Sequence, residues 1–142
     1  MAIGIDVGGS SIKCALVDLH SGGFAGERFS IPTPAQGSTE SLLEALHSVA
    51  SNIPGDHAVG LAFPSVIRNG IARTAANLNK AWIGKSLAVL AGKRLSRPVI
   101  AINDADAAGL AELRYGSARG VQGTVLLLTL GTGIGTALFV DG

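Results

Sequence analysis

The order of apolar and polar positions near the amino terminus predicts strands. Apolar side chains alternate there with small or polar ones, which is typical of half-buried strands. Three such segments follow one another with short turns between them: residues 3–7, 12–18 and 24–31. Strands joined in this way form an antiparallel meander. Pro32 and Pro34 end it, because proline cannot donate to a strand ladder.

Three later segments carry apolar residues at helical spacing and predict helices. They are residues 41–53, 86–95 and 105–115. The first helix is expected to begin at Ser38 or at Ser41, which opens a capping-box pattern, and Ser86 is placed to cap the second. In the third helix, Leu110 and Leu113 are expected to face the core.

Short apolar runs between these helices predict two more strands, at 59–63 and 98–102. Asn69-Gly70 lies between apolar pairs and is typical of a type I′ hairpin turn. Cys14 alternates with its neighbours along a strand and is expected to be a buried apolar side chain.

The last part of the chain has the pattern of a second unit. After a linker at 116–120, a glycine turn lies between two apolar strands: 124–130, 131–135 and 136–140. The same layout surrounds the first glycine turn, which suggests an internal duplication. We predict one domain over 1–116, with 117–142 forming a linker and the first hairpin of a second, similar domain. An isolated two-stranded hairpin is marginal in water. We therefore expect it to be misplaced, disordered or buried against a second copy.

Composition narrows the class of protein. The 142 residues are 47% apolar, enough to form a core, and no apolar run approaches the roughly 18 residues of a membrane span. The net charge of +1 argues against non-specific nucleic-acid binding. The single cysteine excludes an internal disulfide and a cysteine-built zinc site. No basic segment precedes the first strand, so no secretory signal is expected and the cytoplasm is the default location.

Glycine is unusually common, at 20 residues, and clusters where apolar strands end. The first cluster combines a carboxylate, two glycines, two hydroxyls and an amine: Asp6, Gly8, Gly9, Ser10, Ser11 and Lys13. Nests of backbone N–H groups bind phosphate oxygens, and Asp6 can hold Mg²⁺ through water. The alternative is a plain hairpin turn, against which the aspartate at the end of a buried strand argues.

The second cluster is a glycine turn between strands, formed by Gly131, Thr132, Gly133 and Gly135. It does not fit the dinucleotide fingerprint, because Thr136 occupies the third glycine position and a strand follows instead of a helix. A Walker A sequence is also absent. The turn therefore matches the first glycine turn in layout, and a tight turn with incidental glycines is the alternative.

A third candidate site, Asn103-Asp104-Ala105-Asp106, follows a buried strand at the start of a helix. Ligands of open α/β sheets bind at that end of the strands, and a carboxylate there can accept a proton from a substrate hydroxyl. The alternative is helix capping, and Asp106 is expected to serve the helix terminus. The amide of Asn77 suits sugar hydroxyls, with turn formation as its alternative.

Together these stretches resemble the ROK sugar kinases of the actin-like ATPase superfamily. The matching segments are 2–10, 73–77 with 82–84, 103–112 and 126–142. The resemblance implies an α/β, ribonuclease-H-like domain with a mixed sheet, a second similar domain, and a cleft between them. It is strongest to the family's glucokinases that use polyphosphate or ATP. It therefore implies Mg²⁺-dependent phosphoryl transfer to the 6-hydroxyl of glucose, with mannose as a further acceptor, and a homodimer for the full-length protein.

Position by position, the resemblance makes Asp104 the general base and places Asn77, Asn103 and Asp104 in the sugar pocket. Ser65 belongs to the sugar loop and stands where the family usually has glycine after proline. The two glycine turns become the phosphate loops. Binding of polyphosphate would need a basic track, for which the candidates are Lys80, Lys85, Lys93, Arg94 and Arg97.

The resemblance also leaves an alternative function. The family's second domain, with its further sugar-binding Glu and His residues and its cysteine-rich zinc motif, would follow Gly142. The chain is thus expected to be the amino-terminal part of a kinase and inactive alone. The alternative is a non-catalytic sugar-sensing or regulatory module of the same fold.

Overall fold

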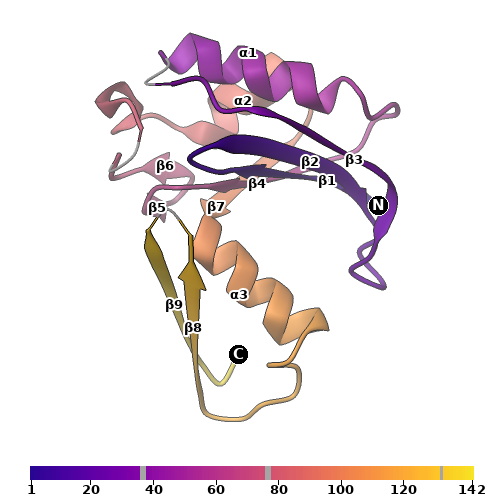
Figure 1. The fold of residues 1–142 in the computed structure, drawn as a ribbon, viewed down its shortest axis with the longest axis vertical. Helices are drawn as coiled ribbons and strands as arrows, with labels where there is room; N and C mark the ends of the chain where they lie inside the picture. Colours follow the sequence, from indigo (N-terminus) through magenta and orange to yellow (C-terminus); the bar gives the residue numbers. More distant parts are fainter. Residues whose placement is uncertain (36–37, 76–77, 132) are drawn as a thin grey trace.

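A mixed five-stranded sheet, in the order β3-β2-β1-β4-β7, forms the centre of the computed structural model, which describes residues 1–35, 38–75, 78–131 and 133–142 (Figure 1). Its strands are β1 (Ala2–Val7), β2 (Ser11–Val17), β3 (Phe24–Pro32), β4 (Val59–Phe63) and β7 (Val99–Asn103). The first three are antiparallel, which confirms the meander, and β4 and β7 run parallel to β1. The predicted α/β class with a mixed sheet is therefore correct.

Helices α1 (Thr39–Ala50) and α2 (Leu87–Leu95) cover one face of this sheet (Figure 1). Alternate residues of β1 point toward them, so Ile3, Ile5 and Val7 are buried. Burial of one such side chain contributes about 1.5–3 kcal/mol. Cys14 lies in the same core, as predicted, and its burial raises the pKa of the thiol to about 11. The thiol is thus protonated at neutral pH and is no nucleophile.

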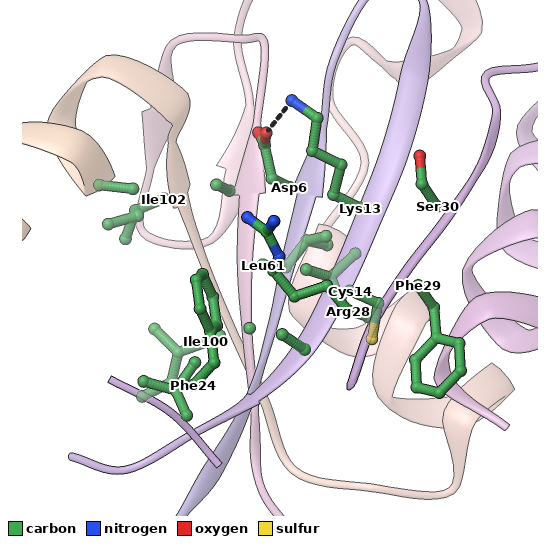
Figure 2. Close-up of a pocket in the computed structure, with 17 residues that line it drawn as sticks. Asp6, Lys13, Cys14, Phe24, Arg28, Phe29, Ser30, Leu61, Ile100 and Ile102 are labelled. Carbon is green, nitrogen blue, oxygen red and sulfur yellow. Dashed lines mark ion pairs between the residues drawn. The ribbon is translucent and has the colours of Figure 1, made fainter. Parts of the chain in front are cut away.

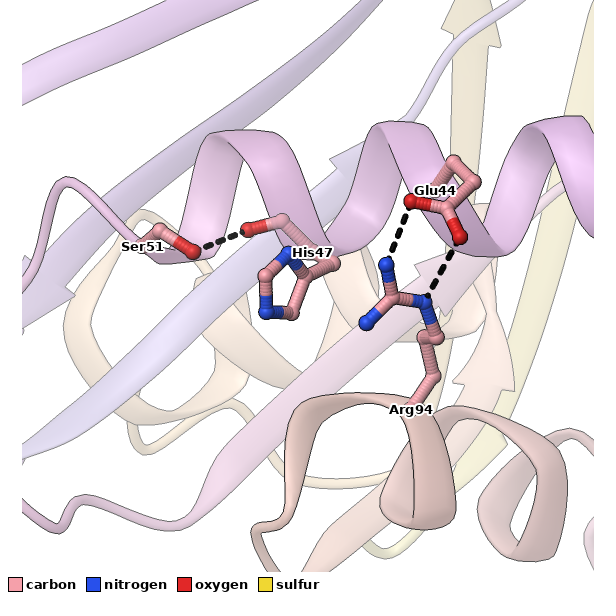
Figure 3. Close-up of polar contacts among 4 residues, drawn as sticks. All are labelled: Glu44, His47, Ser51 and Arg94. Carbon is pink, nitrogen blue, oxygen red and sulfur yellow. Dashed lines mark hydrogen bonds and ion pairs between the residues drawn. The ribbon is translucent and has the colours of Figure 1, made fainter.

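Serine side chains begin both helices. Ser38 accepts a hydrogen bond from the Ser41 backbone N–H at 3.1 Å, so α1 starts at the first of the two predicted positions. Ser86 caps α2, as predicted. The two helices are joined by an ion pair in which Arg94 contacts the Glu44 carboxylate and holds its pKa below the usual range (Figure 3). Figure 3 also shows the Ser51 hydroxyl donating a hydrogen bond to the His47 carbonyl at the carboxyl end of α1.

A small hairpin follows β4. Its strands are β5 (Ile67–Arg68) and β6 (Ile71–Ala72), and the two residues between them have positive φ, 53° and 71°, which confirms the type I′ turn. A short 3₁₀ helix, η1 (Lys80–Trp82), then buries the single tryptophan. Trp82 packs edge-on against Phe63, with ring centroids 5.3 Å apart.

Helix α3 (Asp104–Tyr115) leaves the end of β7 and packs along a separate hairpin, β8 (Thr124–Leu130) and β9 (Ile134–Val140) (Figure 1). The glycine turn between β8 and β9 is shorter than the predicted turn over 131–135, because Ile134 and Gly135 pair with residues of β8. The expectation that Leu110 faces the core is wrong, since 48% of it is exposed. Small side chains of α3 are buried instead, because the hairpin approaches closely: a Cβ on Gly109 would lie 2.2 Å from Phe139.

The β8–β9 hairpin is thus not isolated, because α3 covers one of its faces. Its other face carries large apolar side chains that are more than half exposed: Leu126, Leu128, Leu130, Ile134, Leu138 and Val140. Since α3 contacts both the central sheet and the hairpin, the domain boundary near residue 116 stays a prediction. In the described ranges, no helix is long and apolar enough to cross a bilayer.

Candidate functional site

The first glycine turn is held in place by a residue that sequence reasoning missed. Thr33 donates its hydroxyl to the Gly8 carbonyl at 2.7 Å and its backbone N–H to the Ser10 carbonyl at 3.1 Å. Within the turn, Gly8 donates to the Ser11 carbonyl at 3.0 Å. Gly9 and Ser10 remain exposed at the tip. One signal could have identified Thr33: the β2–β3 register pairs Ser11 with Pro32 and so brings the next residue beside Ser10.

Asp6 and Lys13 face each other across β1 and β2, on the sheet face opposite α1 and α2. The Lys13 Nζ lies 3.6 Å from the Asp6 Oδ2, and both side chains remain about half exposed or more. Figure 2 shows them at one end of a hollow of about 740 Å³ over the sheet, with Phe24 and Ile100 toward the other end. The Asp6 carboxylate and the Lys13 amine of this hollow therefore lie next to the first glycine turn, whereas the Arg28 guanidinium lies over the ring of Phe24.

Asn103 ends β7 and caps α3. Its Oδ1 accepts hydrogen bonds from the backbone N–H groups of Ala105 and Asp106, at 2.9 and 3.1 Å. Sequence reasoning assigned the helix terminus to Asp106, but the cap is Asn103. Asp106 contributes only a negative charge in the first turn, where the helix dipole favours it.

Asp104 uses one of its two carboxylate oxygens within the protein. Its Oδ1 accepts from the Asn103 Nδ2 and from the Ala105 N–H, both at 2.9 Å. Within the described part of the chain, its Oδ2 has no hydrogen-bond partner. The carboxylate is therefore oriented by two donors while one oxygen stays available to a ligand.

The three predicted sites meet at the carboxyl edge of the central sheet. Asp6 pairs with Ala62, which pairs with Ile102, so two strand spacings, about 10 Å, separate the backbones of Asp6 and Ile102. Asn103 and Asp104 follow directly. The strand that follows the second glycine turn reaches the same edge, because a Cβ on Gly135 of β9 would lie 3.2 Å from the Cβ of Ala105.

Some predicted residues are placed elsewhere or are not described. Gly131 donates to the Gly133 carbonyl at 3.0 Å, and neither glycine has an atom within 4 Å of its missing Cβ. Asn77 and Thr132 lie outside the described residues.

A second hollow, of about 530 Å³, lies beside Asn103 and is bordered by Asn69, Asp106 and Phe139, among others.

The basic residues considered for a polyphosphate track mostly serve the local structure. Lys85 donates to the Thr39 hydroxyl, Arg94 pairs with Glu44, and Arg97 donates to the carbonyl of Ile53. Lys93, Arg94 and Arg97 also belong to the end of α2, which leads into the start of β7. They therefore lie at the edge of the sheet away from Asp104.

Comparison with known proteins agrees with this arrangement. The ROK family model matches residues 2–142. The chain is 42% identical over 140 residues to a polyphosphate glucokinase of Mycobacterium tuberculosis, covering 98% of this chain and 53% of the relative. The crystal structure of the inorganic polyphosphate/ATP-glucomannokinase of Arthrobacter sp. strain KM superposes with a TM-score of 0.94 at 48% identity, covering 99% of this chain and 58% of that chain.

A more distant structure has the same fold. The ROK family glucokinase of Streptomyces griseus, solved in complex with glucose and AMPPNP, superposes with a TM-score of 0.82 at 27% identity and covers 99% of this chain and 44% of that chain. The chain thus spans about half the length of the relatives it matches. Because the family model matches nearly every residue of the chain, from β1 to the end of β9, this protein belongs to the ROK family.

Proposed function

We propose that this chain is the amino-terminal part of a kinase that phosphorylates the 6-hydroxyl of glucose, with mannose as a further acceptor. Polyphosphate or ATP would be the donor. The observation that carries the proposal is that two glycine turns and the half-free carboxylate of Asp104 meet at one edge of the sheet. The relatives that share this sequence are named as polyphosphate glucokinase and polyphosphate/ATP-glucomannokinase. A homodimeric complete protein in the cytoplasm belongs to the same proposal.

In this mechanism the protein positions the two substrates and neutralises charge, since phosphoryl transfer needs little covalent chemistry from an enzyme. The Oδ2 of Asp104 accepts the proton of the attacking hydroxyl, while its Oδ1 stays fixed by Asn103 and Ala105. Backbone N–H groups of the two glycine turns bind the phosphate chain. Lys13, at the edge of the first turn, adds a positive charge near it.

Asp6 is the residue that would hold Mg²⁺. Mg²⁺ is usually bound by one or two carboxylates together with substrate phosphates and water, so a single, half-exposed aspartate beside a phosphate loop fits it. Within the described ranges, no three His, Cys, Asp or Glu side chains form a cluster for a metal. The bound ion would screen the charge of the phosphate oxygens.

Glucose would lie between Asp104 and the loops around it. Asn77, Asn103 and Ser65 are the other sugar-pocket residues of the proposal. The hollow beside Asn103, of about 530 Å³, has the size of small-molecule sites, and Asn103 is the proposed sugar residue that borders it. The remaining contacts would come from a second domain.

A fusion protein tests the proposal directly. Residues 1–142 would be joined to the carboxyl-terminal remainder of the Arthrobacter glucomannokinase, whose corresponding part has nearly the same structure. With glucose, Mg²⁺ and either donor, the fusion is expected to turn over at kinase rates, roughly 1–100 per second. The 142-residue chain alone is expected to show none.

Two outcomes would contradict the proposal. A fusion protein that binds glucose without phosphorylating it would favour the sugar-sensing module. Turnover by the 142-residue chain alone would remove the need for a second domain. Purified Arthrobacter kinase, assayed in parallel, controls for the activity of the remainder.

A further inference from the structure

Ser65 has the most deeply buried polar side chain in the described part of the molecule, with 3% of it exposed. Its hydroxyl donates to the carbonyl of Thr74 at 2.7 Å and accepts from the Thr74 N–H at 3.4 Å. A serine hydroxyl has a single proton to donate. The hydroxyl is therefore occupied within the protein.

Two further bonds join the same segments. The Val66 N–H donates to the Thr74 hydroxyl at 3.0 Å, and the Arg73 N–H donates to the Val66 carbonyl at 2.8 Å. We call these bonds, which join Ser65 and Val66 to Arg73 and Thr74, the Ser65 clasp. It closes the base of the β5–β6 hairpin. In the sequence, Thr74 stands three residues before Asn77, one of the proposed sugar ligands.

The clasp is also connected to Asp104. The Asn103 Nδ2 donates to the Ser65 carbonyl at 3.1 Å and to the Asp104 Oδ1 at 2.9 Å. Because the Asn103 Oδ1 is held by two helix N–H groups, this amide cannot rotate without losing bonds. The position of the Ser65 carbonyl therefore influences how the carboxylate of Asp104 is held.

We infer that Ser65 is a positioning residue for the sugar acceptor. Its hydroxyl holds the loop after β4 against Thr74, and through Asn103 it keeps Asp104 oriented toward the acceptor hydroxyl. The inference rests on the proposed kinase function. A glycine at this position would have no side chain to make the bond to Thr74.

Replacement of Ser65 in the fusion protein tests the inference. Ser65→Ala removes the donor of the part-buried Thr74 carbonyl. Because the clasp orients the base Asp104 as well as the acceptor loop, we expect kcat/KM for glucose to fall about tenfold, corresponding to 1.4 kcal/mol, while the KM for the donor stays the same. The effect of Ser65→Cys should lie between those of the parent and of Ser65→Ala, because a thiol is a weak hydrogen-bond donor. The matched control is Ser48→Ala on the exposed surface of α1, which should change neither constant.

A second variant and a direct measurement complete the test. Thr74→Val removes the bond to Val66 from an exposed position and should act in the same direction with a smaller effect. Hydrogen exchange at the Val66 and Thr74 amides reports the clasp without any assay of activity, and Ser65→Ala should speed it. If the parent fusion protein were inactive, the proposed function would fail, yet this exchange would still show whether the clasp exists.

The remaining outcomes overturn the inference. Unchanged exchange would mean that the Ser65 hydroxyl does not hold the loop. A lower unfolding temperature with an unchanged kcat/KM for glucose would mean that Ser65 only supports the fold. Faster exchange with an unchanged kcat/KM for glucose would mean that the clasp does not act on the acceptor.

Discussion

The hairpins β1–β2 and β8–β9 share one local design and have opposite surroundings. Each consists of two apolar strands joined by a short glycine turn, and the last pair before the turn is Val7 with Ile12 in one and Leu130 with Ile134 in the other. The first pair is completely buried under α1 and α2. In the second pair, Leu130 is 81% and Ile134 75% exposed. Similar strand patterns therefore do not reveal which face another element covers.

The turns differ in the same way. The first is held from outside by Thr33, which directly follows β3, so the shape of this proposed phosphate loop is preorganised within this chain. The second relies on its own Gly131–Gly133 bond and on the contact between Gly135 and α3. Helix α3 links the second hairpin to β4 and β7 of the central sheet, and Asp104 is its first residue.

The largest expected effect comes from Asp104, at the start of α3. In the fusion protein, Asp104→Asn should lower turnover about 10²–10⁴-fold while glucose binding persists, because the amide cannot accept the proton. The Oδ1 of asparagine can still accept from Ala105, so the unfolding transition, followed by Trp82 fluorescence, should not change. A variant that kept more than about half of the parent rate would show that Asp104 only serves the helix terminus.

Equivalent apolar positions of the two hairpins should respond differently to truncation. Ile5→Ala removes a buried side chain and is expected to cost about 2–5 kcal/mol of unfolding free energy in the 142-residue chain. Leu128→Ala, on the exposed face of β8, should stay within about 0.5 kcal/mol. Denaturant titrations measure both. Equal losses would mean that the outer face of β8–β9 is covered in solution.

Substitution of Gly109 should detach the second hairpin and spare the first. Gly109→Ala places a methyl group against the ring of Phe139 and is expected to cost about 1–3 kcal/mol. Amide exchange should quicken in β8 and β9 but not in β1 and β2. Gly26→Ala on β3, where a Cβ would meet nothing within 4 Å, is the matched control. Uniform loss of protection in both hairpins would show that they form one cooperative unit.

The smallest effect compares the two turns. A Cβ on Gly8 would lie 2.9 Å from the Ser11 carbonyl oxygen, a backbone atom that must shift, whereas a Cβ on Gly133 is free of contacts. Gly8→Ala is expected to weaken donor binding by the fusion protein about tenfold, as the loss of one charge-assisted hydrogen bond would. Gly133→Ala should leave the fold intact. Titrations with donor and with glucose separate the effects, and equal weakening of both ligands by Gly8→Ala would indicate misfolding.

Much of the fold could be predicted from the sequence, because the spacing of apolar residues and the residues typical of turns and caps are local signals. The meander, the Asn69-Gly70 turn and the cap at Ser86 all depend on residues close together in the chain. The errors occurred where packing decides. Leu110 fits a helical stripe, but α3 packs through Gly109 on a hairpin whose approach no local pattern reveals.

The sequence by itself determined the strands, the helices, the glycine turns and the residues capable of chemistry, since these follow from side-chain type and spacing. Only the tertiary structure decided their connections. Thr33 reaches the first turn because of strand register, and Ser65 reaches Thr74 because a hairpin closes on itself. The sequence alone predicts Asp106 as the α3 cap, but Asn103 is the cap. The amide of Asn103 has partners both in the loop after β4, at Ser65, and in the helix, at Ala105. Hydrogen bonds between distant segments depend on the assembled sheet, and no spacing along the chain encodes them.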